Sequence, residues 1–230
     1  MNCKEHHLPE LELGTGQVRE ALQCLLHTIL FIRAPGPVAP RDVHMEDFDL
    51  TYTRIASVPQ QQASRTQPGA SSGSISSHVP AADNDVDQKV DDAIDKFLQS
   101  LTPIGPELLQ GCINLSFFER RSSRQLFGLV SHEERVTWET WVIRVVVNTT
   151  PRPVSDDTAS VMERQRIQDT AERMLKAALL KIFDGAGESL DHLPPVMYEF
   201  EIKNSSKRAD DRENMRTRVT NMPKLINLGT

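Results

Sequence analysis

The sequence has few of the residues that mark several common classes of protein. Only three cysteines, Cys3, Cys24 and Cys112, occur in 230 residues. Their odd number and wide spacing disfavour a disulfide framework and suit a reducing compartment. No apolar run approaches the length that crosses a bilayer, and the N-terminus lacks the apolar core of a secretory signal. We therefore expect a cytoplasmic protein without stable membrane insertion.

An excess of positive charge is also missing. The net charge is −6, and basic residues gather only locally, so no global basic field attracts nucleic acid. A chain with 38% hydrophobic and 25% charged residues is typical of globular proteins, and its length is sufficient for one main domain with a substantial core. We expect no nucleic-acid partner.

Motifs for nucleotide binding and acyl transfer are absent or incomplete. Gly14-Thr15-Gly16 lies between an expected strand and an expected helix, but Arg19 occupies the third glycine position of a dinucleotide loop and no Walker-type lysine follows. A tight turn explains these glycines. The chain has no Gly-x-Ser-x-Gly elbow, and its seven histidines are scattered. We therefore expect no catalytic site and no cofactor.

Two Cys–His pairs are candidate metal ligands. Cys3 with His6, and Cys24 with His27, are each three residues apart. Zinc sites usually have a tighter, paired spacing of ligands, and a cysteine beside an apolar helix face more often packs in the core. We expect no metal site, so that a binding function is favoured over an enzymatic one.

Hydrophobic periodicity predicts an α+β fold, in which a mostly antiparallel sheet is backed by helices. Asp83 or Asp85 is expected to cap the second helix, Asp156 and Asp157 to begin the third, and Gly185-Ala186-Gly187 to end it. The expected strands cover 8–13, 47–55, 112–120, 138–147 and 196–203, and the expected helices run from 18 to about 29, from 86 to 101 and from 157 to about 183.

Composition divides the chain into four parts. Residues 1–58 are expected to form the first part of the domain and 85–203 the rest. Between them, 59–84 are rich in Gln, Ser, Gly, Ala and Pro, which predicts a disordered insert. Residues 204–230 form a charged C-terminal segment, a candidate for a mobile tail.

The stretch between the two central strands is the most informative. Residues 121–135 are expected to form a loop longer than a hairpin needs. Leu126 and Phe127 lie within it, and they either fold back onto the sheet or remain exposed for a partner. Beyond it, alternation places Trp138 and Trp141 on opposite faces of one strand, which predicts core and edge packing and no shared platform.

Four segments together resemble one known family: residues 1–4, the helix at 17–30, the strand at 49–55, and 138–145 with its Trp138-Glu139-Thr140-Trp141 motif. They are similar to the autophagy-related protein 101 family. The resemblance implies a HORMA domain, whose C-terminal segment can rearrange, and a protein that is not an enzyme. It also implies pairing with the HORMA domain of autophagy-related protein 13 inside the autophagy-initiating serine/threonine kinase complex, and recruitment to the phagophore assembly site.

The resemblance also implies that the loop between the paired strands is the family's protruding finger. In the family this finger carries a Trp and a Phe that recruit downstream autophagy factors. Phe127 matches the Phe, whereas Gln125 occupies the Trp position and Leu126 the neighbouring proline position. The partner-binding residues expected from this comparison are Arg124, Gln125, Leu126 and Phe127.

Two other functions remain open from the sequence. One is a HORMA adaptor of another pathway that clasps a peptide with its C-terminal segment, which would require a strand-like tail. The other is a small metal-dependent enzyme that uses Cys and His residues, which would require a stoichiometric metal. Neither requirement is met by a clear pattern in the sequence.

Overall fold

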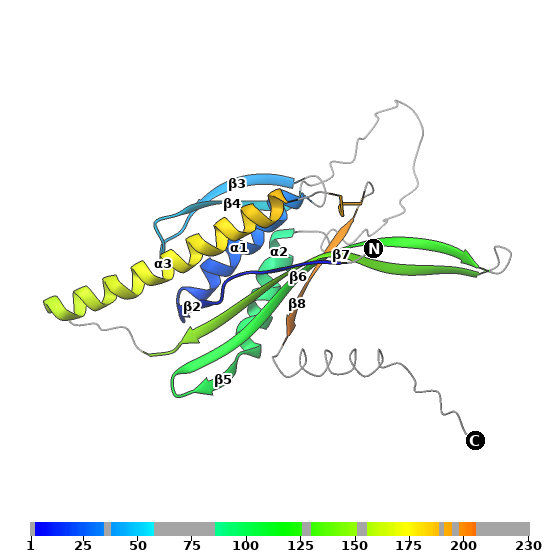
Figure 1. Ribbon diagram of the computed structural model, residues 1–230. Coiled ribbons are helices and arrows are strands. Elements are labelled where there is room, and N and C mark those ends of the chain that lie inside the picture. The colour runs from blue at the N-terminus through cyan, green and yellow to red at the C-terminus, as the bar shows by residue number, and fades with distance from the viewer. Residues whose placement is uncertain are drawn as a thin grey trace, which may run out of the picture.

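The computed structural model describes residues 3–34, 38–57, 86–125, 130–150, 156–188, 191–194 and 198–205. Within these ranges it has three helices, one six-stranded sheet and a separate pair of strands, β3 and β4 (Figure 1). The elements in chain order are β1 (Lys4–His7), β2 (Leu11–Gly14), α1 (Val18–Arg33), β3 (Val38–His44), β4 (Thr51–Ser57), α2 (Val86–Ser100), β5 (Thr102–Gly105), β6 (Leu108–Gln125), β7 (Val130–Asn148), α3 (Thr158–Gly187) and β8 (Glu199–Ser205).

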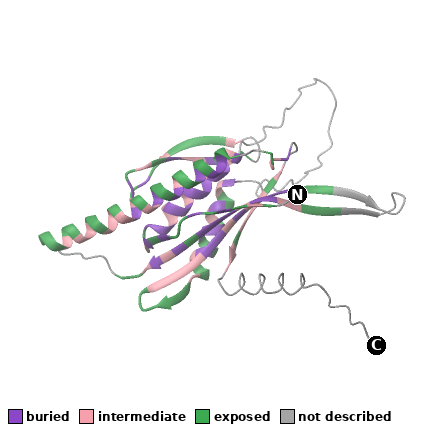
Figure 2. Ribbon diagram, in the orientation of Figure 1, coloured by how far each residue is buried: buried purple, intermediate pink, exposed green. Residues whose placement is uncertain are grey.

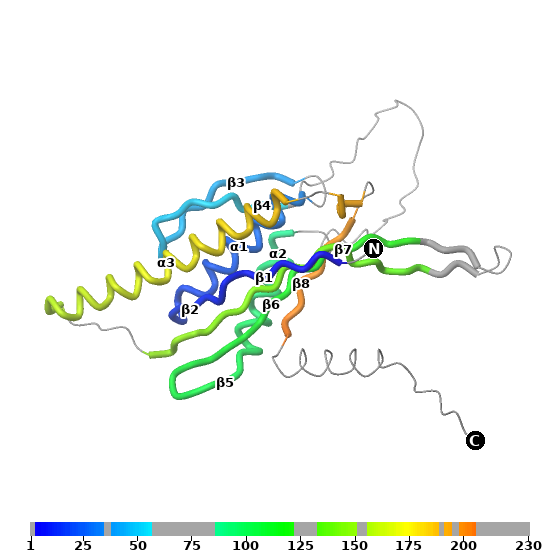
Figure 3. The backbone as a smooth tube through the Cα atoms, viewed as in Figure 1, coloured from blue at the N-terminus to red at the C-terminus, as the bar shows by residue number. Residues whose placement is uncertain are grey.

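The two longest strands, β6 and β7, form the centre of the large sheet. They pair with each other in antiparallel orientation, and β5 and β8 pair antiparallel with the outer edge of β6. The expectation of a mixed α+β fold with a mostly antiparallel sheet is thus confirmed. The outer edge of β7 is covered by β1 and β2, which run parallel to it (Figure 3).

The core lies between this sheet and the helices. Alternate residues of β6 and β7, such as Ile113, Leu115 and Ile143, are fully buried, and they belong to the same core as the buried residues of α1. Helix α1 is buried on most of its circumference because α2, α3 and β4 all pack against it (Figure 2). An apolar stripe that is this wide is typical of a helix at the centre of a domain.

The paired part of β6 and β7 extends much further than the sequence indicated. Residues 121–125 of β6 pair with 130–134 of β7, from Arg121 opposite Glu134 to Gln125 opposite Val130. The expected irregular loop over 121–135 was therefore wrong. A polar run of Arg and Ser has no hydrophobic alternation, but cross-strand pairs of opposite charge such as Arg121 and Glu134 support a strand pair.

This outer part of β6 and β7 has no further strand beside it within the described residues. Pairing with β8 ends at Phe118 and pairing with β1 begins at Glu139. We call residues 119–125 and 130–136 the ribbon. Figure 1 shows that it projects from the rest of the sheet.

A β-bulge marks the base of the ribbon. Phe117 pairs with Glu139 whereas Phe118 pairs with Thr137, so Trp138 is the additional residue. A bulge interrupts the alternation of side chains and increases the local twist. Trp138 and Trp141 are both about 1% exposed and belong to the same core. The expectation that one tryptophan packs in the core and the other at an edge was therefore wrong.

Several short strands differ from the sequence-based expectation. The strand expected at 8–13 begins only at Leu11, as β2, and β1 precedes it. The strand expected at 47–55 is β4, which starts at Thr51, while Phe48 is buried in the bend before it. Strands β3 and β5 were not expected, because they are exposed and each contains a proline.

The three helices lie where the hydrophobic periodicity predicts them. Asp157 caps α3 as expected, because its Oδ1 accepts a hydrogen bond from the Ser160 amide at 2.9 Å. Helix α3 ends at Gly187, within the run Gly185-Ala186-Gly187 that was expected to end it. A Cβ at Gly185 would come within 2.8 Å of the His6 ring, so glycine is required there for close packing. Asp83 and Asp85 lie outside the described residues.

Polar contacts join the two elements on either side of the segment 58–85. Arg54 in β4 pairs with Asp87 and, at 2.8 Å, with Asp91, both in α2. His27 of α1 lies between them: its Nδ1 accepts a hydrogen bond from the Ile55 amide at 3.3 Å, and its Nε2 is 3.5 Å from Asp87. The ends of β4 and α2 are therefore held together by their own contacts.

These contacts give a prediction for the insert, which we propose is dispensable for the fold. Deletion of residues 60–82 should lower the melting temperature by no more than a few degrees, because loop length enters the free energy of folding only logarithmically. Differential scanning calorimetry of the deleted and complete chains measures this directly. A loss of ten degrees or so would show that the segment itself contributes packing.

Candidate functional site

The base of the ribbon is attached to β8 by charged side chains. The Arg135 guanidinium lies 3.5 Å from the centre of the Phe118 ring and pairs with Glu201. Arg120 pairs with Glu199 at 2.9 Å. Such exposed ion pairs each contribute little to stability, although the cation–π contact covers Phe118, which is only 5% exposed. These contacts fix the direction in which the ribbon leaves the sheet.

The residues expected from the sequence to bind a partner lie at the far end of this ribbon. Arg124 is opposite Ser131 and Gln125 is opposite Val130, the last described pair of β6 and β7. Leu126 and Phe127 lie outside the described residues. The structure thus brings Arg124 and Gln125 to the position where the ribbon reaches its tip.

Behind the base of the ribbon lies a buried polar cluster around Glu139. The Glu139 carboxylate, fully inaccessible to solvent, accepts two hydrogen bonds from the Arg33 guanidinium, both at 2.7 Å. His6 Nε2 lies 3.1 Å from the same carboxylate and His192 Nε2 lies 3.5 Å from it. We call these four residues the Glu139 cluster. It joins β1, the end of α1, β7 and the segment after α3.

The cluster has a clear electrostatic balance. Burial would raise the pKa of Glu139, but the hydrogen bonds and positive charge of Arg33, together with His6 and His192, hold that pKa below its ordinary value. Burial lowers the pKa of His6, against the attraction of Glu139. The carboxylate therefore stays ionised, and its oxygens are occupied by donors of this chain.

Aromatic rings enclose the cluster on both sides. The His6 ring stacks on Trp141 with centroids 4.0 Å apart, and Trp138 packs against Tyr198 at 4.9 Å. The Tyr198 hydroxyl donates a hydrogen bond to the carbonyl oxygen of Arg33. This cluster was not expected from the sequence. The available signal was a glutamate between two tryptophans at the start of the mostly apolar run 138–147.

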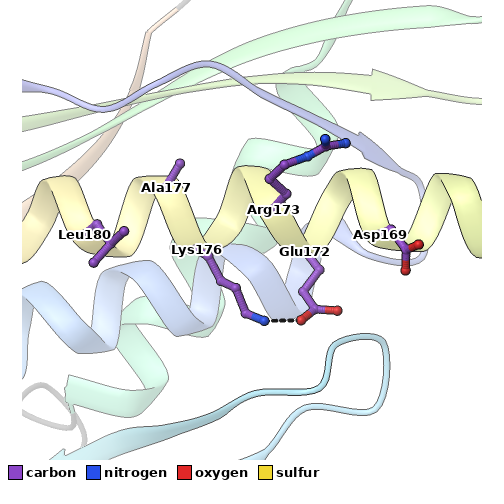
Figure 4. Close-up of a pocket in the computed structure, with 6 residues that line it drawn as sticks. All are labelled: Asp169, Glu172, Arg173, Lys176, Ala177 and Leu180. Carbon is purple, nitrogen blue, oxygen red and sulfur yellow. Dashed lines mark hydrogen bonds and ion pairs between the residues drawn. The ribbon is translucent and has the colours of Figure 1, made fainter.

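The remaining surface offers little for binding a small molecule. In the described residues, no group of three or more His, Cys, Asp or Glu side chains could hold a metal ion. A shallow depression of about 450 Å³ is lined by Asp169, Glu172, Arg173, Lys176, Ala177 and Leu180, all from α3 (Figure 4). A hollow formed by one helix alone does not enclose a ligand as a typical pocket does. None of the described helices is both long and apolar enough to cross a membrane.

The fold and this geometry define a class: a mixed α+β protein, consistent with a HORMA-like domain, whose core contains the buried Glu139 cluster. The family model described as Autophagy-related protein 101 matches residues 10–199. The chain therefore belongs to the autophagy-related protein 101 family, which supports a role in autophagy. The descriptions of the family and of its relatives name no catalytic activity.

Curated relatives from plants and animals agree with this assignment. Autophagy-related protein 101 of Arabidopsis thaliana is 29% identical over 217 residues, which cover 88% of this chain and 87% of the relative. The proteins of the same name from Homo sapiens and Xenopus laevis are each 23% identical over 217 residues, covering 89% of this chain and 81% of the relative.

Proposed function

We propose that the protein is a non-enzymatic scaffold of autophagy initiation, which pairs with the HORMA domain of autophagy-related protein 13 and stabilises it within the initiating kinase complex. The observation that carries this proposal is the family match over residues 10–199. In this proposal the protein acts in the cytoplasm and is recruited to the phagophore assembly site.

The distribution of apolar surface supports a partner-binding protein. Among the residues that the structure describes, six large hydrophobic side chains are exposed, and four of them lie on α3. Single exposed apolar residues are common on monomers, but a concentration on one element is typical of an interaction surface. The exposed residues on α3 are Val161, Met162, Leu180 and Phe183, and the other two are Phe31 and Ile104.

The second part of the proposal concerns the ribbon. We propose that its tip, with Leu126 and Phe127, recruits a downstream autophagy factor. The supporting feature is the ribbon itself, which carries the preceding residues Arg124 and Gln125 away from the sheet. Apolar side chains at the end of such an extension are accessible to a partner and contribute little to the core.

This part predicts that stability and recruitment respond differently to substitution. Phe127→Ala and Leu126→Ala should each change the free energy of unfolding by less than about 1 kcal/mol, since a buried Phe truncated to Ala costs roughly 3–5 kcal/mol. Both should reduce autophagic flux in cells in which the native gene is replaced. Ser123→Ala, on the same ribbon, is the matched control. If Phe127→Ala unfolds the domain, the residue belongs to the core and the proposed recruitment site is wrong.

The most direct test of the proposed partner uses the cell of origin. A tagged copy of the chain, expressed at the native level, should recover autophagy-related protein 13 and the initiating kinase in near-stoichiometric amounts by affinity purification and mass spectrometry. Recovery of neither protein, from cells in which both are abundant, would contradict the proposal.

A further inference from the structure

The outer side of α3 carries an ordered line of side chains that includes two of the exposed apolar residues described above, Met162 and Leu180. Met162, Asp169, Arg173 and Leu180 are all exposed. The spacings of 7, 4 and 7 residues place them on one narrow line along the helix, because 18 residues make five full turns. We call these four residues the α3 crest. Figure 4 shows Asp169, Arg173 and Leu180 in this order along α3.

The two ends of the crest are apolar and unusually exposed. Met162 is 68% exposed and Leu180 is 65% exposed. These are the two largest exposed fractions among the large hydrophobic residues that the structure describes as exposed. The first buried residue of α3 is Ala171, and before it Gln168 is hydrogen-bonded to Gln17 and to the carbonyl oxygen of Asp47, so the first turns of the helix place no residue in the buried core. An isolated helix of this length is only marginally stable in water, and contact with another helix would stabilise it.

The centre of the crest is charged and lacks ion pairs. Asp169 accepts a hydrogen bond from Gln165 at 2.7 Å, and Arg173 donates one to the Thr170 hydroxyl at 3.2 Å. Neither side chain forms a salt bridge with any residue that the structure describes. Both charges therefore remain available to a partner on this surface.

The order of these residues is self-complementary. If a second α3 lies antiparallel to the first and a two-fold axis crosses the crest at the level of residue 171, Met162 of one copy meets Leu180 of the other. The same symmetry places Asp169 of each copy beside Arg173 of the other, so that two pairs of opposite charge form. We propose that a second copy of this chain docks on the α3 crest, which forms an isologous, antiparallel helix pair.

The neighbouring charges on α3 do not oppose this arrangement. The symmetry brings Arg166 to the level of Lys176, but each has a glutamate of its own helix beside it: Glu163 lies 2.7 Å from Arg166, and Glu172 pairs with Lys176. Asp49, in the bend before β4, adds to the negative charge near Lys176. These like charges are therefore compensated within each copy.

The size of the contact sets its strength. Two helices that touch over five turns bury less surface than a typical stable interface of about 1,600 Å². The dimer is accordingly weak and dependent on concentration, and it coexists with monomer in dilute solution.

Sedimentation velocity of the complete chain over a concentration series tests this arrangement. The unmodified chain should shift from monomer to dimer as the concentration rises. Arg173→Asp and Asp169→Arg should each weaken the dimer by about tenfold or more, because each places like charges at both symmetric contacts. The exchange variant with both substitutions should recover most of the affinity. Lys181→Asp, which is exposed on α3 away from the crest, should have no effect.

Recovery by the double exchange separates self-association from other occupants. If a different protein binds the crest, either single variant should weaken its binding, and the double exchange should not restore that binding. A chain that stays monomeric at every concentration overturns the proposal. So does a dimer that Arg173→Asp and Asp169→Arg leave unchanged, or a loss of autophagy-related protein 13 binding without any change in self-association. Circular dichroism of each variant confirms that α3 remains helical.

Discussion

Replacement of Arg33 by methionine is expected to lower the free energy of unfolding by about 3–5 kcal/mol. Methionine has a similar length and fills the same apolar space, so the main change is electrostatic. Glu139 would keep its position, fully buried, but would lose the two 2.7 Å hydrogen bonds that hold its pKa low. His6 does not replace this charge, because burial lowers the pKa of its imidazole.

A double-mutant cycle measured by urea denaturation isolates this interaction. Glu139→Gln alone should also destabilise the domain, whereas the combination with Arg33→Met should cost clearly less than the sum of the two. Arg19→Met is the matched control, since Arg19 forms an exposed pair with Asp95 and should cost less than about 1 kcal/mol. An Arg33→Met variant as stable as that control would show that the Glu139 cluster does not support the fold.

The second large effect is a loss of stability in mild acid. Burial lowers the pKa of His27 to about 4, with the attraction of Asp87 and the repulsion of Arg54 as smaller influences. In the unfolded chain the pKa is 6.5, so between these values the unfolded state binds more protons. The stability that comes from neutral His27 is therefore complete above pH 6.5, is lost progressively as the pH falls to 4, and amounts to about 3 kcal/mol.

His27→Asn should flatten this acid slope. The Asn Oδ1 atom can still accept the hydrogen bond that His27 Nδ1 receives from the Ile55 amide, but it does not titrate. Urea denaturation at a series of pH values between 4 and 7 measures the slope. His7→Asn is the control, because His7 is exposed beside Glu5. A wild-type slope in His27→Asn would mean that another group, such as His6, dominates.

Elements with a strong hydrophobic period were predictable from sequence. In α2, Val90, Ile94 and Phe97 recur at helical spacing, and all three are fully buried. Strand β1 was missed for the opposite reason. Of its four polar residues only His6 is buried, and it lies beside the Glu139 carboxylate. The outer ribbon was missed because backbone pairing, and not burial, defines it.

The candidate site was predictable only in part. The sequence placed Arg124 and Gln125 in a loop between two paired strands, whereas the register places both residues within the strand pair itself. The Glu139 cluster was not predictable, since Arg33, Glu139 and His192 are far apart in the chain and meet only in the folded structure. The burial of both Trp138 and Trp141 in one core was also not predictable, because it accompanies the bulge at Trp138, which no local pattern indicates.

The account of this protein as a HORMA-like scaffold is tested most directly by the mass of its complex with autophagy-related protein 13. The two chains from the same organism, co-expressed and separated by size-exclusion chromatography with multi-angle light scattering, should form a one-to-one complex. The soluble yield of this chain should be higher than when it is expressed alone. Two separate, monodisperse peaks with unchanged yields would contradict the account.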